Sequence, residues 1–170
     1  MNQINIQYYK TSYGELVLGS YDEKLCLCDW RHRKMRATID NRLKKGLGAE
    51  FVEQDNAVLK AARRQLDEYF GQNRTVFTMP LLMVGTEFQK TVWHTLMLVS
   101  YGTSASYLEI AKRINRKKAV RAVASANGAN ALSIFIPCHR IIGSNGELVG
   151  YAGGLPAKKK FLQLEHTVTL

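Results

Sequence analysis

The sequence predicts an α+β protein with an N-terminal domain at residues 1–82 and a C-terminal domain at residues 83–170. Short β-like runs separated by turn residues occupy the first thirty positions, which predicts a small antiparallel sheet. Two Ser/Thr capping boxes, at residues 86–89 and 106–109, open helically spaced apolar runs. A Gly-Ser-Asn-Gly turn at residues 143–146 lies between two short apolar runs, as in a β-hairpin.

The composition is that of a globular protein with excess positive charge. The chain has 170 residues, of which 46% are hydrophobic, and a net charge of +10. Residues 86–170 hold 11 basic and only 4 acidic side chains. The sequence does not open with a basic-then-apolar stretch and has no apolar run long enough to span a bilayer, so we expect a soluble cytoplasmic protein with no membrane partner. Three cysteines, an odd number, do not indicate a disulfide framework.

The N-terminal domain is expected to contain three strands and one helix. The β-like runs are residues 4–10, 15–19 and 25–30, and the sequence predicts a loop with a short helix over 31–50. Apolar residues then recur at helical spacing over 56–70, with Asp55 as the expected N-cap and Gly71 as the stop. Residues 72–85 are expected to form an extended piece and a linker.

The C-terminal domain is expected to begin with three helices. Helices should follow the capping boxes of Thr86 with Gln89 and of Ser106 with Glu109. A tight turn at Asn115 then leads to a helix over 117–126, which makes a helix-turn-helix pattern with the hairpin as its wing. Six basic residues fall within ten positions without an acid: Lys112, Arg113, Arg116, Lys117, Lys118 and Arg121. A charge run is often only a solvated face, but in this context it predicts DNA binding.

The apolar run at residues 134–142 is interrupted by Cys138, His139 and Arg140. We expect a buried strand that ends at Pro137, followed by a helical turn that begins at Cys138. The positive end of that turn and the nearby Arg140 would favour a nucleophilic thiolate. Free cysteine is also commonly buried and inert. The Pro137-Cys138-His139-Arg140 sequence alone is therefore compatible both with a nucleophilic cysteine and with an inert buried one.

The last helix is expected to open at residues 155–156 and to carry a carboxylate on its apolar face. Glu165 follows Phe161 and Leu162 by four and three residues, so it shares their face. A buried carboxylate needs a partner, and His139 would make it the orienting group of a Cys-His pair.

Together these residues resemble the O6-alkylguanine-DNA alkyltransferases, also called methylated-DNA-protein cysteine methyltransferases. The resemblance spans the C-terminal half, at Gly85-Thr86-Glu87-Phe88-Gln89, Val92-Trp93, Tyr101-Gly102, Ser106-Tyr107, Ile110-Ala111, Arg121-Ala122-Val123, Asn130, Ile136-Pro137-Cys138-His139-Arg140, Gly150-Tyr151-Ala152-Gly153-Gly154, Lys158 and Glu165. It implies an N-terminal domain of the ribonuclease H type and a C-terminal winged helix-turn-helix domain.

The resemblance implies DNA repair by direct reversal, with one irreversible alkyl transfer per molecule. Cys138 would accept the alkyl group from guanine O6, and His139, oriented by Glu165, would take the thiol proton through a water. Tyr107 would donate a proton toward guanine N3, and Asn130 would fix the cysteine loop. Four more residues would form the guanine pocket: Tyr151, Ala152, Ile141 and Lys158. Whether O4-alkylthymine is also a substrate stays open.

The family's partner is duplex DNA containing O6-alkylguanine, bound largely without sequence preference by a monomer. The target nucleotide must leave the stack before an in-line attack on O6 is possible. Arg121 would fill the vacated space, and Ala122 would let the helix approach the minor groove. The other implied DNA contacts are Arg116, Lys117, Lys118, Thr86, Gln89 and Tyr107. No cofactor is implied.

The sequence departs from the family at two turns. Asn115-Arg116-Lys117 replaces the usual Gly-x-Pro, and Asn tolerates the left-handed conformation that the turn needs. Ala131 replaces the usual proline after Asn130. Cys26, Cys28 and His32 do not match the spacing of the structural zinc found in some members, so we expect no metal.

Two other functions are compatible with parts of the pattern. A winged-helix protein that only binds DNA would not need Cys138. A cysteine hydrolase could use Cys138, His139 and Glu165, but it would not need the DNA-binding helix pair.

Overall fold

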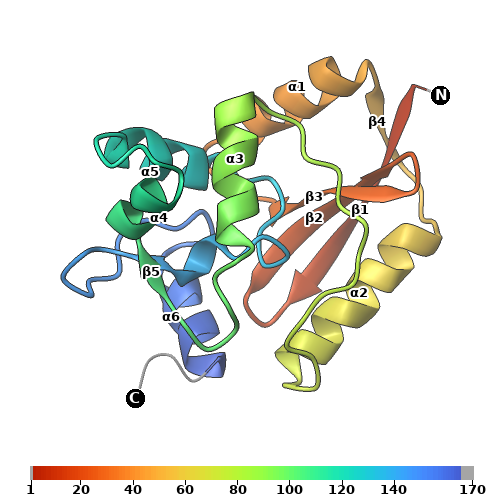
Figure 1. Ribbon diagram of the computed structural model, residues 1–170. Helices are drawn as coiled ribbons and strands as arrows, with labels where there is room; N and C mark the ends of the chain where they lie inside the picture. Colours follow the sequence, from red (N-terminus) through yellow and green to blue (C-terminus); the bar gives the residue numbers. More distant parts are fainter. Residues whose placement is uncertain (1, 166–170) are drawn as a thin grey trace. The chain divides into compact units, whose positions relative to one another are not determined.

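The computed structural model describes residues 2–165, which fall into two compact units that divide between Gly85 and Thr86 (Figure 1). The first unit contains β1 (Gln3–Thr11), β2 (Gly14–Tyr21), β3 (Lys24–Trp30), α1 (Arg36–Leu47), β4 (Glu50–Glu53) and α2 (Ala57–Phe70). The second contains α3 (Glu87–Leu96), β5 (Ala105–Ser106), α4 (Tyr107–Arg113), α5 (Val120–Gly128), β6 (Ile141–Ile142) and α6 (Leu155–Leu164). The α+β class is confirmed. None of the helices over these described residues is long and apolar enough to cross a membrane.

The sheet of the first unit has the strand order β3-β2-β1-β4. The three predicted strands form the expected antiparallel meander, with Tyr8 opposite Val17 and Val17 opposite Asp29. The sheet also has a fourth strand that we did not predict, because β4 pairs with β1 in parallel. The chain returns to the sheet through α1, a 12-residue helix where only a short one was expected.

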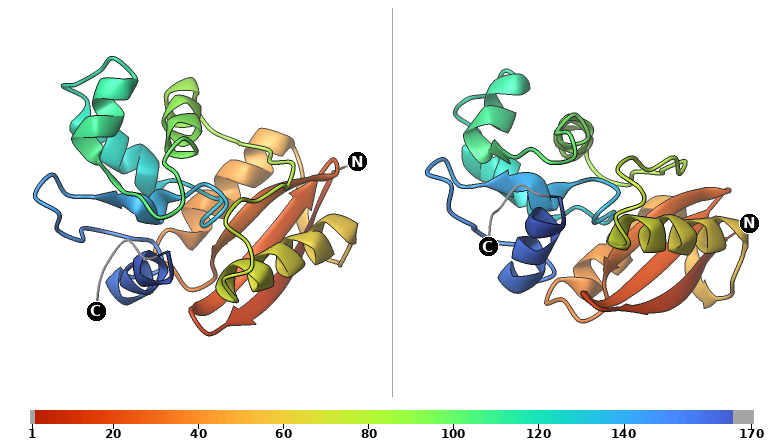
Figure 2. Two further views of the ribbon diagram at one scale, coloured as in Figure 1. Left: turned by 60° about the horizontal axis from the view of Figure 1, so that its bottom comes forward. Right: turned by 90° about the horizontal axis from the view of Figure 1, so that it is seen from below.

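The two helices of this unit cover opposite faces of the sheet (Figure 2). Asp29 is on the face of Val17 and Tyr8, and it accepts hydrogen bonds from Arg33, at 3.1 Å, and from Arg36 of α1, at 3.0 Å. Tyr9, the next residue along β1, points to the other face and donates to Asp67 of α2. Alternation along β1 therefore gives each face its own helix.

The N-cap of α2 is Asn56, so the prediction of Asp55 is wrong. The Asn56 side chain accepts a hydrogen bond from the Leu59 amide at 2.9 Å. The carboxylate of Asp55 instead forms an ion pair with Arg63, whose guanidinium lies 2.7 Å from it. The helix ends at Gly71 as predicted.

The helices of the second unit follow their capping signals. Both predicted capping boxes are present, at the starts of α3 and α4. Asn115 makes the turn after α4 with a left-handed φ of 60°. The next helix, α5, begins at Val120 rather than at residue 117, and its N-cap residue Ala119 makes no side-chain cap. Residues 117–119 include no good capping side chain, so the first turn predicted there does not form.

The predicted strand pairing of the wing is wrong. The turn closes through a 2.8 Å hydrogen bond from the Gly143 amide to the Glu147 carbonyl, but no strand follows at residues 148–149. β6 instead pairs in parallel with β5. The carbonyl of Val149 accepts from the buried ammonium of Lys158 at 2.9 Å, so a side chain on α6 holds this segment.

Candidate active site

Cys138 follows a tight loop and not the buried strand that we predicted. The Ile136 amide donates to the Leu132 carbonyl at 2.8 Å, and Ile134 inside this loop has a φ of +76°. The Cys138 amide then donates to the Ile136 carbonyl at 2.7 Å across Pro137, whose φ of −79° and ψ of 63° make an inverse γ-turn. A single turn of 3₁₀ helix, Cys138–Arg140, begins there, as predicted. The Cys138 side chain is buried.

Asn130 fastens this loop from within. Its side-chain nitrogen donates to the Ile136 carbonyl at 3.0 Å, and its side-chain oxygen accepts from the Leu132 amide at 2.9 Å. Asn130 is itself buried at 2% exposure. These two hydrogen bonds span the loop that leads to Cys138. Ala131, which stands where the family usually has a proline, lies in the same loop.

His139, Glu165 and Arg140 form a buried network in which the carboxylate is shared. The Nε2 atom of His139 lies 2.8 Å from the Oε2 atom of Glu165. Arg140 donates from Nε to Oε1 at 2.8 Å and from a terminal nitrogen to Oε2 at 3.1 Å. It also donates to the Val99 carbonyl at 2.7 Å. The guanidinium of Arg140, which we expected to favour a thiolate, therefore binds the carboxylate of Glu165.

The network sets the charges of its members. Burial raises the pKa of Glu165, but the hydrogen bonds from His139 and Arg140 and the charge of the Arg140 guanidinium outweigh this effect and hold it at about 2. Burial lowers the pKa of His139 below its ordinary value and outweighs the opposing effect of Glu165. A neutral imidazole that donates from Nε2 to Glu165 has its free lone pair on Nδ1. The Nδ1 atom is buried and has no hydrogen-bond partner among the described residues.

Tyr107 opens α4 with its hydroxyl close to the cysteine. Burial raises the pKa of Tyr107, and the charge of Cys138 raises it further. The hydroxyl donates to the Val149 carbonyl at 3.4 Å and bonds to the side chain of Asn127. We had not singled out Asn127, since its position after a helical run marks it only as a helix end.

The predicted pocket residues lie on two segments that Lys158 joins. Ile141 is on β6, whereas Tyr151 and Ala152 follow the wing turn. The Tyr151 ring makes edge contacts with His139, at 6.5 Å between centroids, and with Phe161, at 6.1 Å. Lys158 donates to the backbone carbonyls of both segments.

The basic residues of the helix pair are exposed. Arg116, Lys117, Lys118, Arg121 and Ala122 are all at the surface of the second unit. The guanidinium of Arg116 also lies 5.8 Å from the centre of the Phe88 ring. The side chains of Thr86 and Gln89 accept hydrogen bonds from each other's backbone amides, so their main contact is the helix cap.

The three residues that we considered for zinc do not form a cluster. Cys26 and Cys28 are buried, and burial raises the pKa of Cys26 to about 12. The side chain of His32 is 74% exposed and pairs with Glu15 at 3.2 Å. Within residues 2–165 there is no group of three or more side chains placed to hold a metal.

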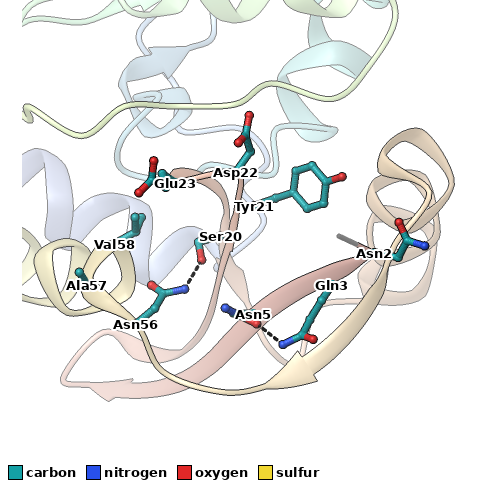
Figure 3. Close-up of a pocket in the computed structure, with 10 residues that line it drawn as sticks. All are labelled: Asn2, Gln3, Asn5, Ser20, Tyr21, Asp22, Glu23, Asn56, Ala57 and Val58. Atoms are coloured by element: carbon teal, nitrogen blue, oxygen red, sulfur yellow. Dashed lines mark hydrogen bonds between the residues drawn. The ribbon is translucent and has the colours of Figure 1, made fainter.

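A cavity of about 520 Å³ in the first unit contains none of the predicted site residues (Figure 3). Its lining includes polar side chains that already bind one another. Asn56 donates to Ser20 at 2.7 Å, and Gln3 donates to Asn5 at 2.7 Å. These four side chains are therefore already engaged in hydrogen bonds with one another.

An exposed basic helix pair and a buried cysteine next to a histidine-carboxylate pair lie in one unit, and this combination fits the class of DNA-binding protein that the sequence resembles. Two family models match the chain: 6-O-methylguanine DNA methyltransferase, ribonuclease-like domain, at residues 4–83, and 6-O-methylguanine DNA methyltransferase, DNA binding domain, at residues 87–167. The chain belongs to the 6-O-methylguanine DNA methyltransferase family. The resemblance noted from the sequence, including the ribonuclease-like first domain, is confirmed.

Individual relatives match along nearly the whole chain. The constitutive methylated-DNA--protein-cysteine methyltransferase of Bacillus subtilis is 40% identical over 165 residues, which cover 92% of this chain and 93% of the relative. The corresponding protein of Methanosarcina acetivorans is 38% identical and covers 92% of this chain and 95% of its own. A crystal structure of Mycobacterium tuberculosis OGT in complex with DNA superposes with a TM-score of 0.83 at 33% identity, covering 97% of this chain and 93% of that one.

Proposed function

We propose that this protein repairs O6-alkylguanine in duplex DNA by moving the alkyl group to Cys138. The sulfur attacks the alkyl carbon in line with the C–O6 bond. A C–S bond forms, the C–O bond breaks, and the guanine leaves with the electron pair and takes up a proton. The observation that carries this proposal is the buried His139–Glu165 pair, at 2.8 Å, directly after a cysteine in a DNA-binding unit.

His139 is the base that removes the thiol proton. Its Nε2 atom is held by Glu165, so the proton must go to Nδ1. The lowered pKa keeps the ring neutral and able to accept a proton at neutral pH. Nδ1 has no protein partner among the described residues, which agrees with a water between it and the thiol.

Tyr107 is the proton donor to the leaving guanine. Its raised pKa keeps the hydroxyl protonated at neutral pH, so it can donate toward N3 as negative charge develops on the base. Tyr151, Ala152 and the Ile141 carbonyl shape the pocket. Asn130 positions the loop that carries the nucleophile.

The helix pair binds the DNA backbone without sequence preference. Arg116, Lys117 and Lys118 are exposed cations that attract phosphates, and such contacts carry no base information. Arg121 and the small Ala122 are exposed on α5, which supports their insertion into the duplex when the target nucleotide leaves it. The protein acts as a monomer in the cytoplasm.

The product is a thioether, which has no activated carbonyl for water to attack. Each molecule therefore reacts once. The test is incubation with a duplex that contains O6-methylguanine, followed by peptide mass analysis. One methyl group on Cys138 is expected, and Cys138→Ser should abolish the transfer while Cys26→Ser preserves it. Repeated turnover, or methylation of Cys26 or Cys28, would refute the proposal.

A further inference from the structure

Glu165 lies at the end of its helix, where a helix holds its residues least firmly. It is the C-cap residue of α6, directly after Leu164, and its carboxylate lies 2.8 Å from His139. The last four carbonyls of an α-helix have no partner within the helix, and helix ends fray. The Glu165 amide donates to the Phe161 carbonyl at 3.0 Å. A fixed distance from the carboxylate to the base nevertheless requires contacts from outside α6.

The loop of residues 99–102, which follows α3, supplies such contacts. The Tyr101 hydroxyl donates a hydrogen bond to the Leu164 carbonyl at 3.3 Å, and this carbonyl is one of the four left open at the end of α6. The Tyr101 ring also lies 5.7 Å from the guanidinium of Arg140, within the range of a cation–π contact. Tyr101 therefore contacts both the helix end that carries Glu165 and the cation that shares its carboxylate.

Two other residues of the 99–102 loop lie against the same group. The Val99 carbonyl accepts a hydrogen bond from Arg140 at 2.7 Å. Gly102 has a φ of +81°, and a Cβ atom at this position would lie 3.4 Å from the backbone carbonyl oxygen of Glu165. The backbone of the loop thus packs closely against Glu165 itself. These contacts indicate that the loop helps to set the position of the carboxylate.

We propose that Tyr101 is a positioning residue, whose hydroxyl ties the end of α6 to the 99–102 loop and so keeps Glu165 in hydrogen-bond contact with His139. This inference rests on the proposed function, in which His139 removes the thiol proton. Tyr101 acts through the backbone of Leu164 and not on the reacting atoms. Without the hydroxyl, the Leu164 carbonyl loses this partner and the last turn of α6 opens more often. The imidazole then loses the hydrogen bond that fixes its tautomer.

Tyr101→Phe tests this role, because it removes the hydroxyl and keeps the ring. Single-turnover transfer from a saturating duplex that contains O6-methylguanine should be about 3- to 10-fold slower, the size expected for the loss of one hydrogen bond. The pH profile of this rate is the readout that a purely structural role would not move. Burial lowers the pKa of His139, as do Arg140 and Lys158, whereas Glu165 raises it. A loosened carboxylate should therefore move the acid limb of the profile to lower pH.

Amide hydrogen exchange gives a second readout, which does not depend on activity. The Glu165 amide, which donates to the Phe161 carbonyl, should exchange faster in Tyr101→Phe than in wild type. Tyr8→Phe is the matched control, because the Tyr8 ring, on β1 of the first unit, also lies against a guanidinium, that of Arg31 at 3.7 Å. This control should keep the wild-type rate, pH profile and exchange of the Glu165 amide.

A wild-type rate and acid limb in Tyr101→Phe would overturn the inference, and so would an equal change in Tyr8→Phe. A slower rate with an unmoved acid limb would also overturn it, because that result indicates a general loss of structure. A failure of the proposed function looks different. Wild-type protein would then transfer no methyl group to Cys138, while the Glu165 amide would still exchange faster in Tyr101→Phe.

Discussion

Glu165→Gln tests the electrostatic core of the site with the smallest change of shape. The carboxylate accepts from His139 on one side and from Arg140 on the other, and all three side chains are buried. A glutamine amide has one acceptor oxygen and one donor nitrogen. Whichever way it turns, its NH₂ group faces either an N–H of Arg140 or the N–H of His139. The imidazole can avoid the second conflict only by moving its proton from Nε2 to Nδ1.

Both stability and reaction rate should fall. The buried guanidinium of Arg140 loses its counter-charge, which typically costs about 3 kcal/mol or more of unfolding free energy. The pKa of Glu165 leads to a similar magnitude, because a value of about 2 in place of the ordinary 4.5 corresponds to about 3 kcal/mol. A proton on Nδ1 removes the base, and the loss of a general base costs about 10²- to 10⁴-fold in rate.

The sign of the pH dependence gives a second readout. A carboxyl group with a lowered folded-state pKa adds stability above its unfolded pKa of 4.5, and this stability is lost as the pH falls toward 2. The difference in unfolding free energy between wild type and Glu165→Gln should therefore shrink as the pH falls through this range. Urea denaturation at several pH values measures it, with Glu147→Gln in the exposed wing as the control.

Single-turnover transfer from O6-methylguanine DNA measures the rate. A Glu165→Gln variant that is folded, as judged by its urea transition, and that transfers methyl at the wild-type rate would refute the assignment of His139 as the base. A difference in stability that stays constant down to pH 3 would refute the low pKa of the carboxyl group.

Three further outcomes are expected. Asn130→Ala removes two buried hydrogen bonds from the cysteine loop and should cost about 2 kcal/mol of unfolding free energy, measured by urea denaturation. A loss near zero would show that the loop is stable without Asn130. Arg121→Ala, at an exposed position, should slow repair of duplex DNA far more than reaction with the free base, and equal slowing would exclude a role in extrusion. The lowered pKa of Lys158 means that native protein releases this proton before unfolded protein, so its contribution to stability should rise between pH 8 and 10.5. Lys158→Met should lack that rise in urea denaturation. Methylation of Cys138 removes the thiolate charge and should move the start of the rise to lower pH.

The elements with local signals could be predicted from the sequence. Each capping box consists of two residues three positions apart, Thr86 with Gln89 and Ser106 with Glu109. The first residues of α3 and α4 could therefore be predicted from the sequence. The buried face of α6, and the burial of Glu165 at its C-cap, follow from helical spacing alone. The pairing of Glu165 with His139 was predictable because a buried carboxylate requires a partner.

The elements that depend on distant contacts could not be predicted. Only Ile39 and Leu43 of α1 are buried, and the start of this helix is held by the ion pair of Arg36 with Asp29, which lies on β3. β4 has four residues and exists because β1 offers it an edge. The apolar run before Cys138 had the composition of a strand. It forms part of a loop in which Asn130 binds the Leu132 amide and the Ile136 carbonyl, and composition does not reveal that competition.

The role of Arg140 follows from the geometry of the turn that contains it. A 3₁₀ turn has three residues, so consecutive side chains leave it in three different directions. Cys138, His139 and Arg140 fill those three positions. His139 and Arg140 both reach Glu165, which leaves the third direction to the nucleophile. Since Arg140 supplies the counter-charge of Glu165, His139 can stay neutral, and a neutral imidazole is what the removal of a thiol proton requires. Within the proposed function, Arg140 thus supports the thiolate through the base and not by direct attraction.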